Sequence, residues 1–217
     1  MGLLTSICRP VLEAKRKYPA FGVQWVMVRS MEKTMKKQEK ITKLFRPGEI
    51  WVVTGPNGSG KTRLAMGLVA SFAVDENKGA LYMPLEKDIK NCAAIMANVH
   101  SGIPLQSTWT PKAAKAAGER LTAAAKAISG APVYLSDMEP GGLPELIKEV
   151  RKFARKGIKL AVIDNVISER FGATGKTGTT LCGELRELAK DIKAAVVMVT
   201  PRYNKETDGE ADSVIDV

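Results

Sequence analysis

The chain has 217 residues, of which 45% are hydrophobic and 26% charged, with a formal net charge of +10. This length suits one buried α/β domain with a small attachment. No apolar run approaches the roughly 20 residues that a membrane-spanning helix needs. Three widely spaced cysteines and a single histidine, His100, argue against a disulfide framework, a histidine-based metal centre and Ser-His-Asp chemistry.

The positive charge is concentrated near the N-terminus. Residues 1–46 contain 11 Lys and Arg against 3 Asp and Glu, whereas residues 47–217 contain 22 against 20. We therefore divide the chain into a basic N-terminal arm, residues 1–46, and a nearly neutral domain, residues 47–217. The arm is either a polyanion-binding element or a solvated helix face.

In the arm, we expect Phe21–Val28 to form a short strand or extended segment and Ser30–Leu44 to form a helix. A turn at Arg46–Gly48 then leads into the domain. The predicted strands are Ile50–Thr54, Ala80–Met83, Val133–Leu135, Lys159–Ile163, Ala195–Thr200 and Ser213–Val217. The predicted helices are Thr62–Ala73, Lys87–Val99, Pro111–Ser129, Leu143–Lys156 and 180–193, with a Gly/Thr-rich loop over Glu169–Thr180. This alternation predicts an α/β fold with a mostly parallel central sheet flanked by helices.

Residues 55–62, GPNGSGKT, match the phosphate-binding pattern G-x-x-x-x-G-K-[ST] between a predicted strand and a predicted helix. The glycines let backbone N–H groups converge on phosphates, and the helix adds the positive end of its dipole. Lys61 supplies a charge for the β- and γ-phosphates, and Thr62 supplies an oxygen for Mg²⁺. The residues expected to hold ATP are Gly55, Pro56, Asn57, Gly58, Ser59, Gly60, Lys61, Thr62 and Arg63. The chain is therefore predicted to bind MgATP.

Two acids complete the predicted catalytic set with Lys61. Asp164 ends a buried strand, where ligands collect in open α/β sheets, and it is expected to orient Mg²⁺ through water. Glu86 follows another strand at the same sheet edge and is expected to polarise the attacking water. Asn165 stands where many ATPases have a glutamate, which favours Glu86 as the base. The alternative for Glu86 is a surface acid at a helix start.

These motifs resemble the motor domain of DnaB-type replicative helicases, which are RecA-like P-loop ATPases. The resemblance is carried by GPNGSGKT, by Pro84–Glu86 after its strand, and by KLAVIDN at 159–165. The segments SGIPL at 101–105, APVYLSD at 131–137 and AAVVMVT at 194–200 extend it over about residues 47–217. The resemblance implies a RecA-like P-loop NTPase fold, ATP and Mg²⁺ as cofactors, and hydrolysis that drives translocation on DNA or its unwinding.

The C-terminal part departs from that family. Pro201–Tyr203 replaces a Gln-containing segment, and the stretch that contacts DNA in the family is shortened to Asn204–Asp212. The family's arginine and lysine fingers have no counterpart here unless Arg202 substitutes for them. The basic arm stands where the family has a helical domain. We expect nucleotide binding, and hydrolysis that needs a neighbouring subunit or partner.

Single-stranded nucleic acid, DNA in particular, is the expected partner. The candidate contacts are Arg170 and Lys176 in the loop after Asp164, followed by Arg202 and Lys205. A solvated loop without a ligand is the alternative for these residues. The resemblance also implies a homo-oligomer, a hexameric ring being one form, in a bacterial or phage-encoded cytoplasmic setting without a membrane.

Other functions stay open on the residues alone. One is a RecA-like ATPase without helicase activity, such as a recombination or loading factor or a viral genome-packaging motor. The shortened C-terminal stretch favours it, and the Gly/Thr-rich segment 172–180 is similar to one in cystovirus packaging ATPases. Another is a nucleotide-gated assembly module with little turnover. ABC and mismatch-repair ATPases share the Gly-Pro-Asn start, but the chain lacks an LSGGQ-like segment and an Asp-Glu pair at 164–165.

Overall fold

The computed structural model describes residues 44–86, 88–103, 111–171 and 180–217. The predicted strand Phe21–Val28, nearly all of the predicted helix Ser30–Leu44, and Lys176 lie outside these ranges. Phe45 is 4% exposed and packs against Trp51, with 4.9 Å between the ring centroids. The hydrophobic core therefore includes a residue just before the predicted domain start at 47.

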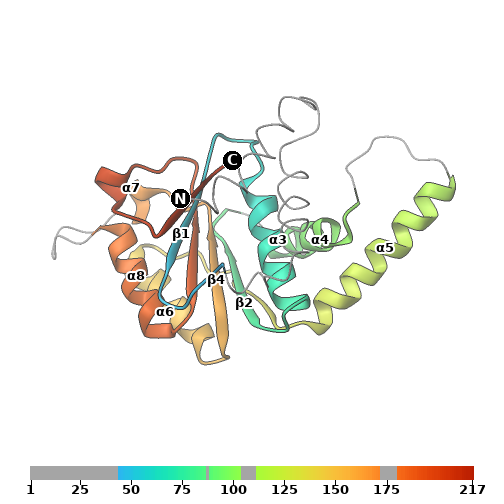
Figure 1. Ribbon diagram of the computed structural model, residues 1–217, viewed down its shortest axis with the longest axis horizontal. Helices are drawn as coiled ribbons and strands as arrows, with labels where there is room; N and C mark the ends of the chain where they lie inside the picture. The colour runs from blue at the N-terminus through green and yellow to red at the C-terminus, as the bar shows by residue number, and fades with distance from the viewer. Residues whose placement is uncertain (1–43, 87, 104–110, 172–179) are drawn as a thin grey trace.

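Six strands form one sheet in the order β3-β2-β4-β5-β1-β6, and each pairing is parallel (Figure 1). The strands are β1 Ile50–Thr54, β2 Gly79–Pro84, β3 Val133–Leu135, β4 Ile158–Asp164, β5 Ala195–Val199 and β6 Ser213–Asp216. The six predicted strands are confirmed with small shifts at their ends, where hydrogen bonding frays. Because the strands are parallel, the carboxyl ends of all six meet at one edge of the sheet.

Seven helices lie in the described ranges. They are α3 Lys61–Val74, α4 Ile89–Ser101, α5 Pro111–Gly130, α6 Leu143–Ala154, α7 Ser168–Phe171, α8 Leu181–Ile192 and α9 Lys205–Asp208. The prediction of an uninterrupted loop from Glu169 is wrong up to Phe171, because the backbone N–H groups of Arg170 and Phe171 bond to Ile167 and form α7. The short helix α9 was not predicted, and the Asn204 side chain caps it.

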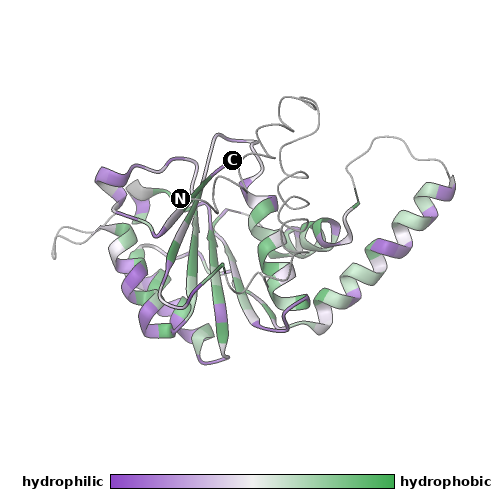
Figure 2. Cartoon of the chain, in the orientation of Figure 1, coloured by the Kyte–Doolittle hydropathy of each residue, from purple (hydrophilic) through white to green (hydrophobic). Residues whose placement is uncertain are grey.

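Helices cover both faces of the sheet, as expected for strands that are buried on both sides. Residues of α3 and α4 build one hydrophobic core with side chains such as Val53, Tyr82 and Val162. Residues of α6 and α8 build a second core on the other face, with Leu81, Ile163 and Met198. Figure 2 shows apolar strands in the middle and polar outer faces on the helices. Helix α5 extends away from the body (Figure 1), and in the described ranges no helix has the length and apolar content to cross a membrane.

Candidate nucleotide-binding site

The phosphate loop, residues 55–60, joins β1 to α3 at the carboxyl edge of the sheet. Gly60 caps α3 with a φ of +106°, and Gly55 has a φ of +146°. A Cβ atom on Gly55 would lie 2.3 Å from the Val217 carbonyl oxygen, so a larger residue cannot fit there. The first turn of α3 contains no acid and its cap offers no side chain. Its backbone N–H groups are thus available to an anion.

Lys61 is the first residue of α3, and its side chain is buried. Its Nζ atom donates to the carbonyl oxygens of Gly55 at 2.7 Å and Pro56 at 2.8 Å. Desolvation lowers the pKa of Lys61, and the charge of Asp164 acts in the opposite direction. A buried ammonium group bonded to neutral carbonyls gains from a nearby anion, which phosphate oxygens would supply.

Asp164 is the last residue of β4 and only 4% exposed. One of its oxygens, Oδ2, accepts a short hydrogen bond from the hydroxyl of Tyr82 on β2. Burial and then the charge of Asp164 raise the pKa of Tyr82, so the phenol stays protonated and donates. The sequence analysis did not identify Tyr82. Its only sequence signal is a hydroxyl-bearing side chain near the end of an otherwise apolar buried strand.

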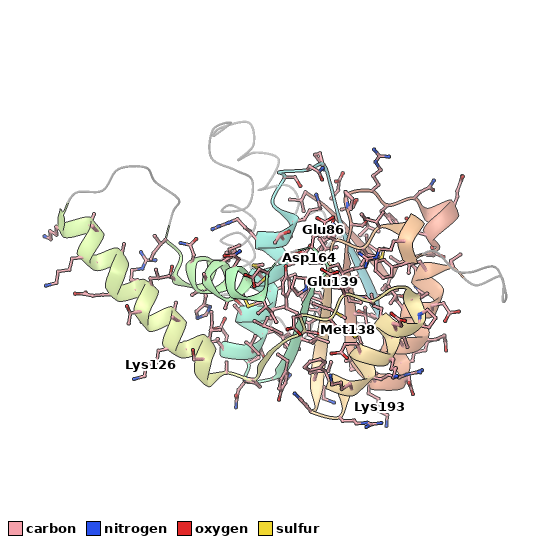
Figure 3. The ribbon with its side chains drawn as sticks, turned by 180° about the vertical axis from the view of Figure 1, so that it is seen from behind. Glu86, Lys126, Met138, Glu139, Asp164 and Lys193 are labelled. Carbon is pink, nitrogen blue, oxygen red and sulfur yellow. The ribbon has the colours of Figure 1, made fainter. Side chains whose placement is uncertain are left out.

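Glu86 follows β2 directly and is exposed. Its strand pairs with β4 so that Pro84 lies opposite Asp164, and the backbone N–H of Leu85 donates to the Asp164 carbonyl at 3.1 Å. This pairing brings Glu86 and Asp164 to the same end of the sheet, as Figure 3 shows from behind. The two carboxylates differ in environment, since Glu86 faces solvent and Asp164 is enclosed.

A cavity of about 480 Å³ joins the phosphate loop to these acids. This volume lies within the range usual for small-molecule sites. Arg63 also lines the cavity, where Asn98 accepts a 2.9 Å hydrogen bond from its guanidinium. The lining residues are Asn57, Gly58, Gly60, Lys61, Thr62, Arg63, Pro84, Leu85, Glu86, Ile95, Asp164 and Asn165. Of these, Ile95 and Asn165 were not among the predicted ligands, and Asn165 has a φ of +72°, a conformation that asparagine tolerates better than most residues.

The residues fit a nucleoside triphosphate with Mg²⁺. Among the described residues, Ser59 Oγ is buried without a hydrogen-bond partner, and a phosphate oxygen would supply one. No group of three or more His, Cys, Asp and Glu side chains in the described ranges could hold a metal ion. That agrees with Mg²⁺, which is bound through one or two carboxylates together with substrate phosphates.

The predicted nucleic-acid contacts are not among the residues that line this cavity. Arg170 lies on α7, and its guanidinium donates to the Pro140 carbonyl at 2.9 Å. Lys205 lies on α9 and pairs with Glu210 at 2.9 Å. Arg202 is exposed in the turn between β5 and α9. Their role stays a prediction.

Comparisons with known proteins agree with this architecture. The family model for the DnaB-like helicase C-terminal domain matches residues 30–212. A replicative DNA helicase DnaB from Synechocystis sp. is 24% identical over 157 residues, which cover 70% of this chain and 18% of that protein. The chain thus spans less than a fifth of that relative's length.

Two solved structures share the fold. One is an isolated ATPase domain with a TM-score of 0.58 at 14% identity, and the match covers 82% of this chain and 70% of that one. The other is a DnaB-like replicative helicase studied with primase, with a TM-score of 0.58 at 13% identity and with 92% and 56% covered. These similarities, with the parallel sheet, confirm the predicted RecA-like α/β fold.

Proposed function

The chain belongs to the family of DnaB-like helicase C-terminal domains, and on this basis we propose that it hydrolyses ATP to translocate on single-stranded DNA and unwind it. The observation that carries the proposal is the cavity that Lys61, Asp164 and Glu86 line together. It combines a phosphate-binding loop, an enclosed acid for the metal and an exposed acid for the water.

Binding would use the loop and the start of α3. Backbone N–H groups there would hold the β- and γ-phosphates, and Lys61 would exchange its two carbonyl contacts for phosphate oxygens. Thr62 would bind Mg²⁺ through its hydroxyl, and Asp164 would do so through water. The ion, when bound, neutralises charge on the phosphates.

Glu86 would act as the general base for hydrolysis. As the water oxygen bonds to the γ-phosphorus, the water proton passes to the Glu86 carboxylate. The bond from that phosphorus to the β–γ bridging oxygen breaks, and ADP and phosphate are released. The exposure of Glu86 supports this role, because a solvated carboxylate is charged at neutral pH.

The proposal includes a homo-oligomer, of which a hexameric ring is one form. The cavity is lined on one side by this chain's phosphate loop and acids, whereas no arginine other than Arg63 lines it in the described ranges. A neighbouring subunit would supply an arginine finger, an arrangement that raises turnover strongly in related chemistry. We also propose a cytoplasmic location.

ATP turnover with and without single-stranded DNA tests the function. Glu86→Gln should lower DNA-stimulated turnover by about 100-fold or more and leave ATP binding intact. Glu187→Gln is a matched control, because Glu187 lies on α8 and pairs with exposed Lys190 at 2.8 Å, an interaction of little energetic value. Normal turnover in Glu86→Gln would remove the role of Glu86. A wild-type chain that is monomeric with every nucleotide and unaffected by DNA would remove the motor.

A RecA-like ATPase without helicase activity is the second candidate. It is favoured by the compact segment between β5 and β6, whose polar groups bond within the segment. The Tyr203 hydroxyl donates to Gly209 at 2.8 Å and accepts from Ala211 at 3.2 Å, and Lys205 pairs with Glu210. A strand-displacement assay with and without partner proteins separates the two, since a loading or packaging ATPase would displace no strand in either case.

A further inference from the structure

Tyr82 brings a hydroxyl group to the nucleotide site from the middle of strand β2. Its side chain is 0% exposed and is among the largest of the fully buried side chains. Its ring packs with apolar residues of β4 and α3, including Val162 and Leu68. Its hydroxyl donates to Oδ2 of Asp164.

The strand register explains how the two residues meet. Tyr82 lies opposite Val162, and Asp164 is two residues further along β4. Residues two apart on a strand share one face of the sheet, so Tyr82 and Asp164 point to the same side. Two residues advance about 6.6 Å along a parallel strand, a span that a tyrosine covers when it leans toward the carboxyl edge.

Packing alone does not account for this hydroxyl. The core around Tyr82 is apolar, and a phenylalanine ring would fill the same volume. The hydroxyl is instead bonded to a buried acid that lines the cavity. A carboxylate at a strand end rotates about its side-chain bonds unless a partner holds it, and Tyr82 is such a partner.

We propose that Tyr82 is a positioning residue for Asp164. Its hydroxyl holds Oδ2 within the protein and leaves Oδ1 to face the water that links Asp164 to Mg²⁺. This inference rests on the proposed function, because it requires Asp164 to orient Mg²⁺. Partners of this kind set the geometry of metal ligands, and their loss usually weakens metal affinity by about 10- to 100-fold.

The test is a Mg²⁺ titration of the binding of a fluorescent ATP analogue, with an EDTA reference. In Tyr82→Phe, the Mg²⁺ concentration at half-maximal enhancement should rise by about 10-fold, and the affinity in EDTA should stay that of the wild type. Tyr134→Phe is the matched control. Tyr134 lies on neighbouring β3 and packs against Phe153 on the opposite face, with 6.0 Å between the ring centroids.

The Asp164→Asn background separates positioning from packing. If Tyr82 acts through Asp164, adding Tyr82→Phe to Asp164→Asn should cause no further change in Mg²⁺ dependence. A Tyr82→Phe protein with wild-type Mg²⁺ dependence would overturn the inference alone. So would an equal loss of affinity in EDTA, because that would indicate a distorted fold. A wild-type chain that binds the analogue equally in Mg²⁺ and EDTA would overturn the proposed function as well.

Discussion

The Nζ atom of Lys61 lies 2.7 Å from the carbonyl oxygen of Gly55, the first residue of the phosphate loop. The same atom contacts Pro56 at 2.8 Å. The lysine therefore closes the loop on itself through neutral acceptors. Because a charge-assisted bond to an anion is stronger than one to a carbonyl, phosphate oxygens would displace these two contacts.

Replacing Lys61 should weaken nucleotide binding. Hydrogen bonds to charged groups contribute about 1.5–3 kcal/mol, so Lys61→Met should lower ATP affinity by about 10- to 100-fold. Equilibrium binding of a fluorescent ATP analogue measures this. Lys126→Met is the control, because Lys126 is exposed on α5 and well separated from Asp164 in Figure 3. Equal affinity of Lys61→Met and the wild type would contradict a phosphate-binding role.

Gly209 is a position where side-chain volume should disturb the fold. It follows α9 with a φ of +88°, and a Cβ atom there would lie 2.0 Å from Thr180 Oγ1. Thr180 caps α8, since its side chain accepts from the Gly183 backbone N–H. Gly209→Ala should therefore cost about 2–4 kcal/mol of unfolding free energy, from backbone strain and overpacking.

Urea unfolding measures the cost at Gly209 against Gly118→Ala. Gly118 lies within α5, and a Cβ atom there meets no other atom within 4 Å. That control should be neutral or more stable by up to about 1 kcal/mol, because alanine favours helix. If both variants had the same stability, the tight packing of Gly209 on Thr180 would be wrong.

The elements that the sequence predicted are those that depend on local pattern. The strand Ile50–Thr54 and the phosphate loop after it follow from an apolar run, spaced glycines and a lysine, all contiguous in sequence. The Tyr82–Asp164 contact joins residues 82 positions apart, and it depends on the register of β2 against β4. Register is fixed when the faces of the sheet pack, so no local pattern reveals it. The short helix α9 was missed for a similar reason, because contacts between Tyr203 and Gly209 and the cap at Asn204 hold a single turn.

Cys182 should be unreactive in the folded protein. It is 0% exposed on α8, and burial, with the charge of Asp208, raises its pKa from 9.0 to about 12. The thiolate is the reactive form, so iodoacetamide at pH 8 should label Cys182 in urea but not in the native chain. Peptide mass spectrometry reads this out. Labelling at the same rate in both states would show that α8 opens readily.

The same pKa difference predicts how stability changes with pH. The unfolded thiol titrates near its ordinary value of 9.0 and the folded thiol near 12, so the folded chain retains an extra proton between them. Stability from this group is present below pH 9 and is lost as pH rises toward 12. Thermal unfolding of wild type and Cys182→Ala from pH 8 to 10.5 should show a steeper decline in the wild type. Parallel curves would contradict the shift.

Binding of single-stranded DNA, if it uses the predicted basic residues, should depend on salt in a countable way. Each lost phosphate contact lowers the slope of log K against log salt concentration by about 0.7 for a single strand. Arg202→Ala should show this reduction, because its side chain is exposed in the turn after β5. Lys205 and Arg170 should contribute less, because DNA would have to displace Glu210 from the first and Pro140 from the second. Lys176→Ala tests the remaining predicted contact.

Lys193→Ala is the control for these variants. Lys193 is exposed before β5, at the amino edge of the sheet, whereas Arg202 follows β5 at the carboxyl edge (Figure 3). Fluorescence anisotropy with labelled oligonucleotide, from low to moderate salt, gives the slopes. If a general positive field attracted DNA, removing Lys193 would lower affinity as much as removing Arg202, since long-range attraction depends on net charge and not on position. A specific surface at the carboxyl edge instead requires that Arg202 changes the slope and Lys193 does not.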